Sequence, residues 1–469
     1  MRFRLRGPIA FLLIAFCSAA RGDEVDAYVS AFIKRHHIPG AAISVVKGGK
    51  LVKAAGYGAA NLELNVPVTA NTLFEIGSIT KQFTAEAVMM LEEDGKLSVD
   101  DPLMKYLPEA PVSWSHITLR HLLTHTSGLH DWEAANSLSF RREYTIQEYI
   151  HLIAGTPLDF APGSQWSYTN SAFPLLGIVV ERVSAVPFEQ FVTERIFQPA
   201  RMSTARFRHP EQIVRNRAAG YVDVGGELRN GEPLRPHMVM PNGGILASAT
   251  DMAAWDVALH SGRLVKPATL ERMTEPVTLS NGEHGASGMA WFKTTFRNHS
   301  MLLHNGSTAA GFSAVVYHYT TDDLGVTVLF NIDRWNAVNT LAEHIAGMFV
   351  PGASISSLPA RNEDDSKRTA RFIALLTDIA AGKDPESLTP DLRGHIQASA
   401  RKNAAEHLKA KRAVTCVDVE DFGPSGKQQF GTVIRWTERY RIETTGGAVY
   451  YTLNLTADGL VARFVPEED

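Results

Sequence analysis

The chain has 469 residues, 45% hydrophobic and 20% charged, which is typical of a globular protein of two or three domains and excludes a disordered chain. The formal net charge of −4 leaves no basic excess, so we expect no nucleic-acid partner and no polybasic membrane patch. Two cysteines are too few for a disulfide framework or a cysteine-rich zinc site.

The N-terminus has the pattern of a secretory signal peptide. Three arginines precede a mostly apolar stretch, residues 8–20, which is too short to span a bilayer as a helix. Small residues at Ala20 and Gly22 fit a cleavage site, so we predict a signal peptide at 1–22 and a periplasmic or secreted protein. A lipoprotein signal at Cys17 is the alternative, although a bulky residue precedes this cysteine. No later segment reaches the roughly 18 apolar residues of a membrane span.

The residue pattern of the mature chain predicts strands and helices at both ends of a long helical segment. A helix is predicted at 25–36 from apolar residues at helical spacing, and Gly48-Gly49 marks a hairpin turn. The order predicts an α+β fold, an antiparallel sheet flanked by terminal helices plus a helical lobe at about 79–300. The predicted strands are 41–46, 51–57, 301–304, 312–319 and 325–331, and further helices are predicted at 79–93, 172–183, 251–260 and 337–349.

The composition changes after residue 350. Residues 351–366 are rich in serine, proline and acidic residues, as linkers often are. Two helical patterns, at about 367–381 and 389–410, precede a meander of short strands. We therefore predict a main domain at 23–350 and a small α+β accessory domain at 367–469.

An S-x-x-K motif can supply an activated nucleophile, and the spacing occurs at Ser44–Lys47, Ser78–Lys81 and Ser399–Lys402. The first lies in a predicted strand, where a spacing of three sends the side chains to opposite faces, and the third lies on a polar helix. Ser78 begins a predicted helix, where free N–H groups point at the serine and Lys81 follows one turn later. Lys81 can take the hydroxyl proton if its pKa is lowered. The alternative is a helix-capping serine beside a surface lysine.

Two further motifs can complete a site for acyl transfer. Tyr168 and Asn170 form the one Y-x-N of the chain; the tyrosine can relay a proton if a nearby lysine lowers its pKa, and the asparagine can hold a substrate amide. His304 and Gly306 end a predicted strand, where the glycine lets a substrate approach the backbone. The N–H of Ser307 can then join that of the serine nucleophile in binding an oxyanion. Each motif alone also fits an ordinary packed side chain.

The order S-x-x-K, Y-x-N, H-x-G resembles the serine β-lactamase and penicillin-binding-protein-like family, in particular its class C and esterase branch. The resemblance covers roughly residues 24–350 and implies a β-lactamase-like fold. Three more segments are similar to segments of that family: Asn71–Glu75 (NTLFE), Leu119–Leu129 (LRHLLTHTSGL) and Gly243–Asp251 (GGILASATD).

The resemblance implies a role for each motif residue. Ser78 is the acylated nucleophile, Lys81 and Tyr168 share the general acid and base work, and Asn170 positions the substrate. His304 stands where true β-lactamases have the lysine of a K-T-G motif. Because a histidine is mostly neutral at pH 7, it suits a substrate carboxylate less well than a lysine does. We therefore expect esters or peptides to be better substrates than β-lactams.

The sequence thus predicts an exported serine hydrolase that acts on a small-molecule or peptide substrate: an ester, a D-amino-acid peptide or a β-lactam. We expect no cofactor and no metal, because His121 and His125 lack the glutamate and third ligand of a zinc motif. The alternative is a catalytically silent relative that binds cell-wall peptide or a protein partner. The presence of all the nucleophilic parts argues against it.

Overall fold

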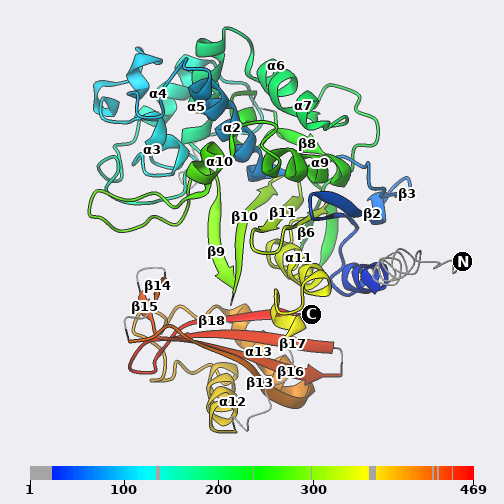
Figure 1. Cartoon of the computed structure of the whole chain (residues 1–469). Coiled ribbons are helices and arrows are strands. Elements are labelled where there is room, and N and C mark those ends of the chain that lie inside the picture. The colour runs from blue at the N-terminus through cyan, green and yellow to red at the C-terminus, as the bar shows by residue number, and fades with distance from the viewer. Residues whose placement is uncertain are drawn as a thin grey trace, which may run out of the picture. The chain divides into compact units, whose positions relative to one another are not determined.

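The computed structural model describes residues 24–133, 138–235, 237–296, 298–358, 366–424, 427–429, 432–445 and 447–468. The chain forms two compact units, Met1–Ala342 and Glu343–Asp469 (Figure 1). This division falls within helix α11 (Trp335–Phe349), before the predicted linker at 351–366. The domain boundaries stay predictions, since residues 359–365 of that linker and the whole predicted signal peptide lie outside the described residues.

A seven-stranded antiparallel sheet forms one layer of the first unit, and it confirms the predicted α+β fold. Its order is β3-β2-β1-β12-β11-β10-β9, so the first strand pairs with the last strand of the unit. Gly48 and Gly49 have φ values of 59° and 64°, as the predicted hairpin turn requires. The strands are β1 Gly40–Lys47, β2 Lys50–Asn61, β3 Val66–Pro67, β9 Phe292–Phe296, β10 His299–Thr308, β11 Phe312–Tyr319 and β12 Leu324–Phe330.

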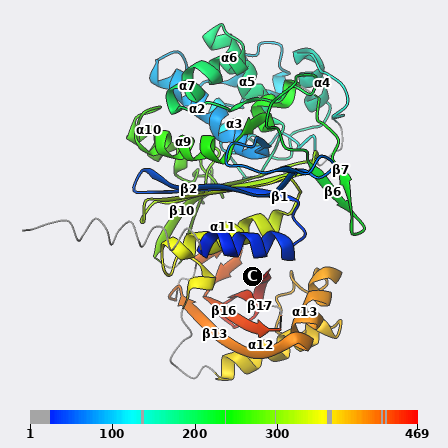
Figure 2. The ribbon, with the colours of Figure 1, turned by 90° about the vertical axis from the view of Figure 1, so that its right-hand side faces the viewer.

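Helices cover both faces of this sheet (Figure 2). The helix at residues 24–35 and the first turns of α11 lie on one face, and the helical lobe, with α9 (Ala249–His260) next to the strands, lies on the other. Strand β1 is buried on both of its sides for this reason, and it reads as a continuous apolar run rather than an alternating one.

The helical lobe is built around α2 (Thr80–Glu93), whose residues from Thr80 to Leu91 are all buried. Because this helix is buried on every side, its polar residues are buried as well, and Lys81 is one of them. A short sheet pairs β4 (Phe74–Glu75), which comes just before this helix in the chain, with the later strands β8 (Ile245–Ala247) and β5 (Arg206–Phe207). The other helices are α3 Leu119–Leu123, α4 Ile146–Ala154, α5 Ala172–Ser184, α6 Phe188–Val192, α7 Gln198–Ala200, α8 Met240–Gly243 and α10 Pro267–Thr274.

The second unit has its own four-stranded antiparallel sheet and its own apolar core. Helix α13 begins at Ala398, not near residue 389 as predicted, because Pro390 and Gly394 (φ 75°) hold the preceding segment in turns. Cys416 is buried, and its thiol donates to the backbone oxygen of Asp418 at 3.7 Å. Among the described helices of the chain, none has the length and apolarity needed to cross a membrane. The main elements of the unit are α12 Ser366–Ala380, α13 Ala398–Ala410, β13 Lys411–Asp421, β16 Trp436–Thr444, β17 Gly447–Leu455 and β18 Val461–Glu468, with a hairpin of β14 Lys427–Gln429 and β15 Thr432–Ile434.

Candidate active site

Ser78 lies in a single 3-10 turn, Gly77–Ile79, directly before α2 rather than at the first residue of that helix. Gly77 has a φ of 54°, and a Cβ at this position would come within 2.7 Å of the backbone N and O of Ser307. A Cβ at Gly306 would lie 1.9 Å from the carbonyl oxygen before the turn and 3.2 Å from Ser78 N. The two glycines therefore allow the turn and strand β10 to touch backbone to backbone.

The amine of Lys81 is surrounded by three oxygen atoms. Its Nζ lies 2.9 Å from Ser78 Oγ, 2.9 Å from Asn170 Oδ1 and 3.2 Å from the backbone oxygen of Asn242. The two asparagine oxygens can only accept hydrogen bonds. A neutral amine therefore directs its two N–H groups at the asparagines, which leaves its lone pair facing the serine hydroxyl.

The orientation of the Asn170 amide follows from its other partners. Its Nδ2 donates to Asp131 Oδ2 at 3.4 Å and to Glu133 Oε2 at 2.6 Å. Because ionised carboxylates only accept hydrogen bonds, the NH₂ group must face them and Oδ1 must face Lys81. The structure thus brings Ser78, Lys81 and Asn170 together, as the sequence predicts.

Burial decides the charge of this lysine. Lys81 is fully buried, and burial lowers its pKa to about 7, against the opposing pull of the Asp131 and Glu133 carboxylates. A large fraction of the amine is neutral near pH 7 and can accept a proton. The ring of Tyr168, 5.0 Å from Nζ, helps to exclude water from the amine.

Tyr168 contacts both Ser78 and Lys81, but its pKa is raised rather than lowered. Protein atoms surround its hydroxyl end, and burial raises the pKa of the phenol above its ordinary value, with Asp131 and Glu133 adding to the rise and a hydrogen bond with Ser78 opposing it. The condition set for Tyr168, a pKa lowered by a nearby lysine, is not met: Lys81 lies over the ring, 5.0 Å from its centroid, and burial outweighs any lowering. Tyr168 is therefore suited to donate a proton rather than to remove one.

His125, for which the sequence suggested no catalytic role, belongs to this site. Its ring stacks on that of Tyr168, with centroids 4.3 Å apart and planes inclined by 28°. Its Nδ1 accepts a hydrogen bond from the backbone N–H of Thr169 at 3.2 Å. The stacking contact fixes the tyrosine ring, and the hydrogen bond fixes the backbone of the residue that follows it. The position of His125 in the segment Leu119–Leu129 was the one signal in the sequence that could have pointed to it.

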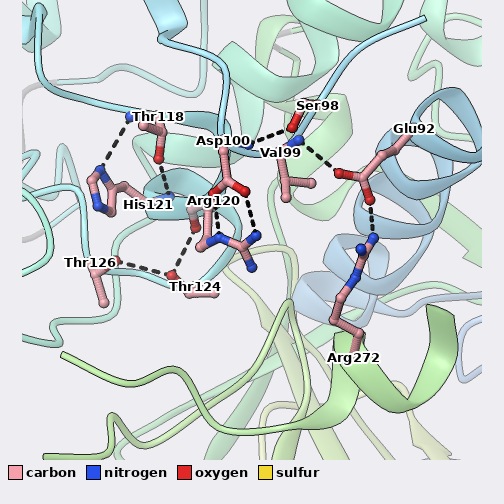
Figure 3. A network of polar contacts seen from close by, with 10 residues as sticks. All are labelled: Glu92, Ser98, Val99, Asp100, Thr118, Arg120, His121, Thr124, Thr126 and Arg272. Atoms are coloured by element: carbon pink, nitrogen blue, oxygen red, sulfur yellow. Dashed lines mark hydrogen bonds and ion pairs between the residues drawn. The ribbon is translucent and has the colours of Figure 1, made fainter. Parts of the chain in front are cut away.

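A polar network anchors the segment that carries this histidine (Figure 3). Arg120 on α3 donates to the Asp100 carboxylate at 2.7 and 2.9 Å. The hydroxyls of Thr124 and Thr126, on either side of the histidine, lie 3.0 Å apart. His125 has a left-handed backbone conformation, with a φ of 59°, and the hydrogen bonds of this network hold its neighbours in place.

His304 is buried beside the same tyrosine, with ring centroids 6.4 Å apart. Its Nδ1 lies 2.6 Å from the carbonyl oxygen of Asn305, so Nδ1 carries the proton. Burial, with Lys81 adding, lowers the pKa of His304 to about 3, and the ring is neutral at physiological pH. Its Nε2 is left as a buried acceptor with no hydrogen-bond partner among the described residues.

Alternate residues of β10 face opposite ways, as in any strand. His304 and Gly306 face the helical lobe, whereas Asn305 and Ser307 face the layer of α11. There Asn305 Nδ2 donates to Asn339 Oδ1 at 2.6 Å, and the Ser307 hydroxyl is hydrogen-bonded to a carboxylate, that of Asp333. What Ser307 offers the site is its backbone N–H, not its hydroxyl.

A pocket with about 410 Å³ of empty space, part of it open to solvent, adjoins these groups. Ser78, Asn170 and Ser307 line it, together with Glu133 and Asn242. Because Ser78 and Ser307, whose N–H groups are the two predicted oxyanion donors, border one pocket, a carbonyl group in it can reach both residues.

In the described part of the chain, two separate clusters of histidine and carboxylate side chains are each compact enough to hold a metal ion. They are His209, Glu211 and His237, and Asp256, His260 and His318. Neither cluster contains a residue of the site around Ser78. His121, one of the two histidines weighed as ligands, accepts a hydrogen bond at Nδ1 from the N–H of Thr118 at 3.2 Å.

Comparisons with known proteins point in one direction. A family model described as Beta-lactamase matches residues 25–346. Protein flp of Staphylococcus aureus (strain NCTC 8325 / PS 47) is 25% identical over 334 residues, which make up 69% of this chain and 65% of that protein. Penicillin-binding protein 4* of Bacillus subtilis (strain 168) is 29% identical over 394 residues, which cover 78% of this chain and 86% of the relative.

Solved structures are similar as well. The octameric penicillin-binding protein homologue from Pyrococcus abyssi aligns with a TM-score of 0.60 over 92% of this chain and 90% of its own, at 22% identity, which shows the fold alone. The penicillin binding protein from Bacillus halodurans aligns with a TM-score of 0.58 at 26% identity, over 67% of this chain and 98% of its own.

Proposed function

Because the chain belongs to the beta-lactamase family, we propose that it is a serine hydrolase that forms an acyl-enzyme on Ser78. One observation carries the proposal: Lys81 Nζ lies 2.9 Å from Ser78 Oγ while acceptor oxygens take its other contacts. An amine with a pKa of about 7 in this arrangement is a base for the hydroxyl proton.

Acylation follows from these contacts. Ser78 Oγ attacks the carbonyl carbon of the substrate while its proton moves to Lys81 Nζ. The carbonyl oxygen gains negative charge, which the N–H groups of Ser78 and Ser307 stabilise. The phenol of Tyr168, which keeps its proton, donates it to the departing oxygen or nitrogen, and the Lys81 ammonium restores it.

Deacylation reverses the proton path. Water gives a proton to the neutral Lys81, or to the Tyr168 phenolate if that has not been restored, and attacks the acyl carbon. The ester bond to Ser78 breaks, and the serine oxygen recovers a proton from the same groups. Asn170 keeps Lys81 in place throughout, because its amide is fixed by two carboxylates.

The neutral His304 favours an ester as the substrate over a β-lactam. The carboxylate of a β-lactam needs a cation at this position, and a ring whose pKa is about 3 supplies none. Amides such as D-amino-acid peptides follow the same chemistry with a poorer leaving group. The predicted signal peptide supports action outside the cytoplasm, in the periplasm or after secretion.

Labelling and turnover together test the proposal. A fluorophosphonate probe followed by intact-mass measurement should add one probe to the wild-type protein and none to Ser78→Ala. The wild type should hydrolyse p-nitrophenyl esters faster than nitrocefin. A wild-type protein without an adduct and without turnover is a catalytically silent binder. Nitrocefin turnover without ester turnover contradicts the choice of substrate.

A further inference from the structure

The pocket beside Ser78 carries the negative charge of Glu133, which forms no ion pair with a lysine or arginine among the described residues. Asp131 and Glu133 both direct carboxylate oxygens at the single Nδ2 of Asn170. One neutral amide cannot neutralise two carboxylates, and burial raises the pKa of both carboxyls, as happens when a charge lacks a partner. The nearest amine, Lys81, has a pKa of about 7 and so supplies only part of a positive charge at pH 7.

The one arginine among the described residues that line this pocket is already engaged. Arg208 pairs with Glu75 at 3.3 Å, and each of these side chains is only 1% exposed. A buried ion pair of this kind does not open to serve a ligand without leaving a charge uncompensated. An anionic substrate group therefore has little to bind here, whereas a cationic group meets the Glu133 carboxylate in the pocket wall, and Asp131, on the same Asn170 amide, adds negative charge nearby.

Two buried polar atoms in the pocket wall also lack partners. Asn242 is 8% exposed, and its Oδ1 has no hydrogen-bond partner among the described residues. Thr308 is 8% exposed too, and the same holds for its Oγ1. An orphaned acceptor in a cavity is costly unless a ligand supplies a donor. The Glu133 carboxylate and the unpartnered Asn242 Oδ1 both favour the same kind of ligand, a positively charged hydrogen-bond donor.

We propose that this pocket is an ammonium subsite, in which Glu133 and Asn242 Oδ1 bind a primary amine carried by the acyl group of the substrate. An ammonium group has three donors and no acceptor, which matches a wall of acceptors. A chain of three hydrogen bonds, through Lys81 and Asn170, links Ser78 to Glu133, so a few carbons separate the amine from the reacting carbonyl. The inference rests on the proposed acyl-enzyme chemistry and makes Glu133 a specificity residue.

Three matched p-nitrophenyl esters test the subsite: the 6-aminohexanoyl, heptanoyl and mono-adipoyl esters, whose chains end in an ammonium, a methyl and a carboxylate. For the wild type we expect kcat/KM to be about tenfold higher for the amine than for the methyl ester, and lowest for the carboxylate. Glu133→Gln keeps an acceptor for Asn170 but removes the charge, and should bring the amine-to-methyl ratio close to one. Glu227→Gln, at an exposed glutamate that does not line the pocket, is the matched control and should leave the ratio unchanged.

The outcomes separate this inference from the proposed function. Turnover of the methyl ester as fast as the amine ester overturns the subsite and leaves the hydrolase in place. Equal losses for all three esters in Glu133→Gln, restored by Glu133→Asp, make Glu133 a positioning residue for Asn170 and also overturn the subsite. Failure of all three esters, with no adduct on Ser78, overturns both proposals.

Discussion

Two lysines of this chain follow the same four-residue pattern and differ in almost everything else. Lys81, three residues after Ser78, is fully buried and is surrounded by three oxygens. Lys402, three residues after Ser399, lies on α13 with 75% of its side chain exposed, and its Nζ lies 3.8 Å from a carboxylate oxygen of Glu406. The spacing allows a serine and a lysine to meet, but the surroundings decide whether the amine can accept a proton.

A third copy of the pattern fails for another reason. Ser44 and Lys47 lie in strand β1, where a spacing of three points their side chains to opposite faces. Ser44 is buried at 1% exposure, and Lys47 Nζ donates to the backbone oxygen of Asp322 instead. Helical geometry and burial are both needed, and the following experiments separate their contributions.

The largest effect is expected from removing the buried amine. Lys81→Met should lower kcat/KM for a p-nitrophenyl ester by roughly a thousandfold, because the base for the serine proton is lost. Lys402→Met is the matched control in the exposed copy of the motif and should change kcat/KM by less than about twofold. Equal effects of the two substitutions on ester turnover would refute the comparison.

A stability change is expected at a second buried ionisable group on α2. Glu86 is fully buried and neither of its carboxylate oxygens has a hydrogen-bond partner among the described residues, so burial raises its pKa to about 8. A folded-state pKa above the unfolded value means that stability falls as pH rises from about 4.5 to about 8 and is level above that range. Glu86→Gln should therefore unfold with a free energy roughly 2–4 kcal/mol higher than the wild type at pH 9.

Urea unfolding at several pH values checks this expectation. The gain should vanish near pH 4, where the wild-type carboxyl is neutral in both the folded and the unfolded state. Glu227→Gln, at an exposed site, controls for the loss of a charge. A gain that is the same at pH 4 and pH 9 would show that Glu86 is not the source of the pH dependence.

The smallest effect is a shift of the pH profile. Ionised Asp131 raises the pKa of Lys81, which lies at about 7, so kcat/KM should rise with pH through an apparent pKa near 7. Asp131→Asn removes this charge, and the rising limb should move to lower pH by up to about one unit. Asp223→Asn, next to Arg334 and away from the pocket, should not move it. A limb that stays in place in Asp131→Asn would assign the titration to another group.

The arrangement of the fold was largely predictable from local patterns. Apolar runs between turn residues predicted strands that agree with β1, β11 and β12 within a residue or two, and helical spacing predicted α2, α5 and α9. Strand β9 was not predicted, because its side chains are mostly exposed and no apolar alternation marks it. The meeting of Ser78 with Lys81 was also foreseeable, since both lie within one turn of chain.

Long-range features of the site could not be read from neighbouring residues. The stacking of His125 on Tyr168 joins segments more than forty positions apart, and the raised pKa of the tyrosine depends on burial and on Asp131 and Glu133. A sequence pattern carries no measure of solvent access, so the direction of that pKa shift could not be derived from it. The 3-10 turn at Ser78 likewise depends on the fit of Gly77 against β10.

The contact between Gly77 and β10 also bears on the order in which the protein is made. The turn with the nucleophile leaves the ribosome long before the strand that supplies the Ser307 N–H and one wall of the pocket. A chain still being synthesised therefore contains Ser78 and Lys81 but lacks the second N–H donor for a carbonyl oxygen. The two N–H groups proposed to bind the carbonyl oxygen are therefore brought together only when these two distant stretches pack against each other.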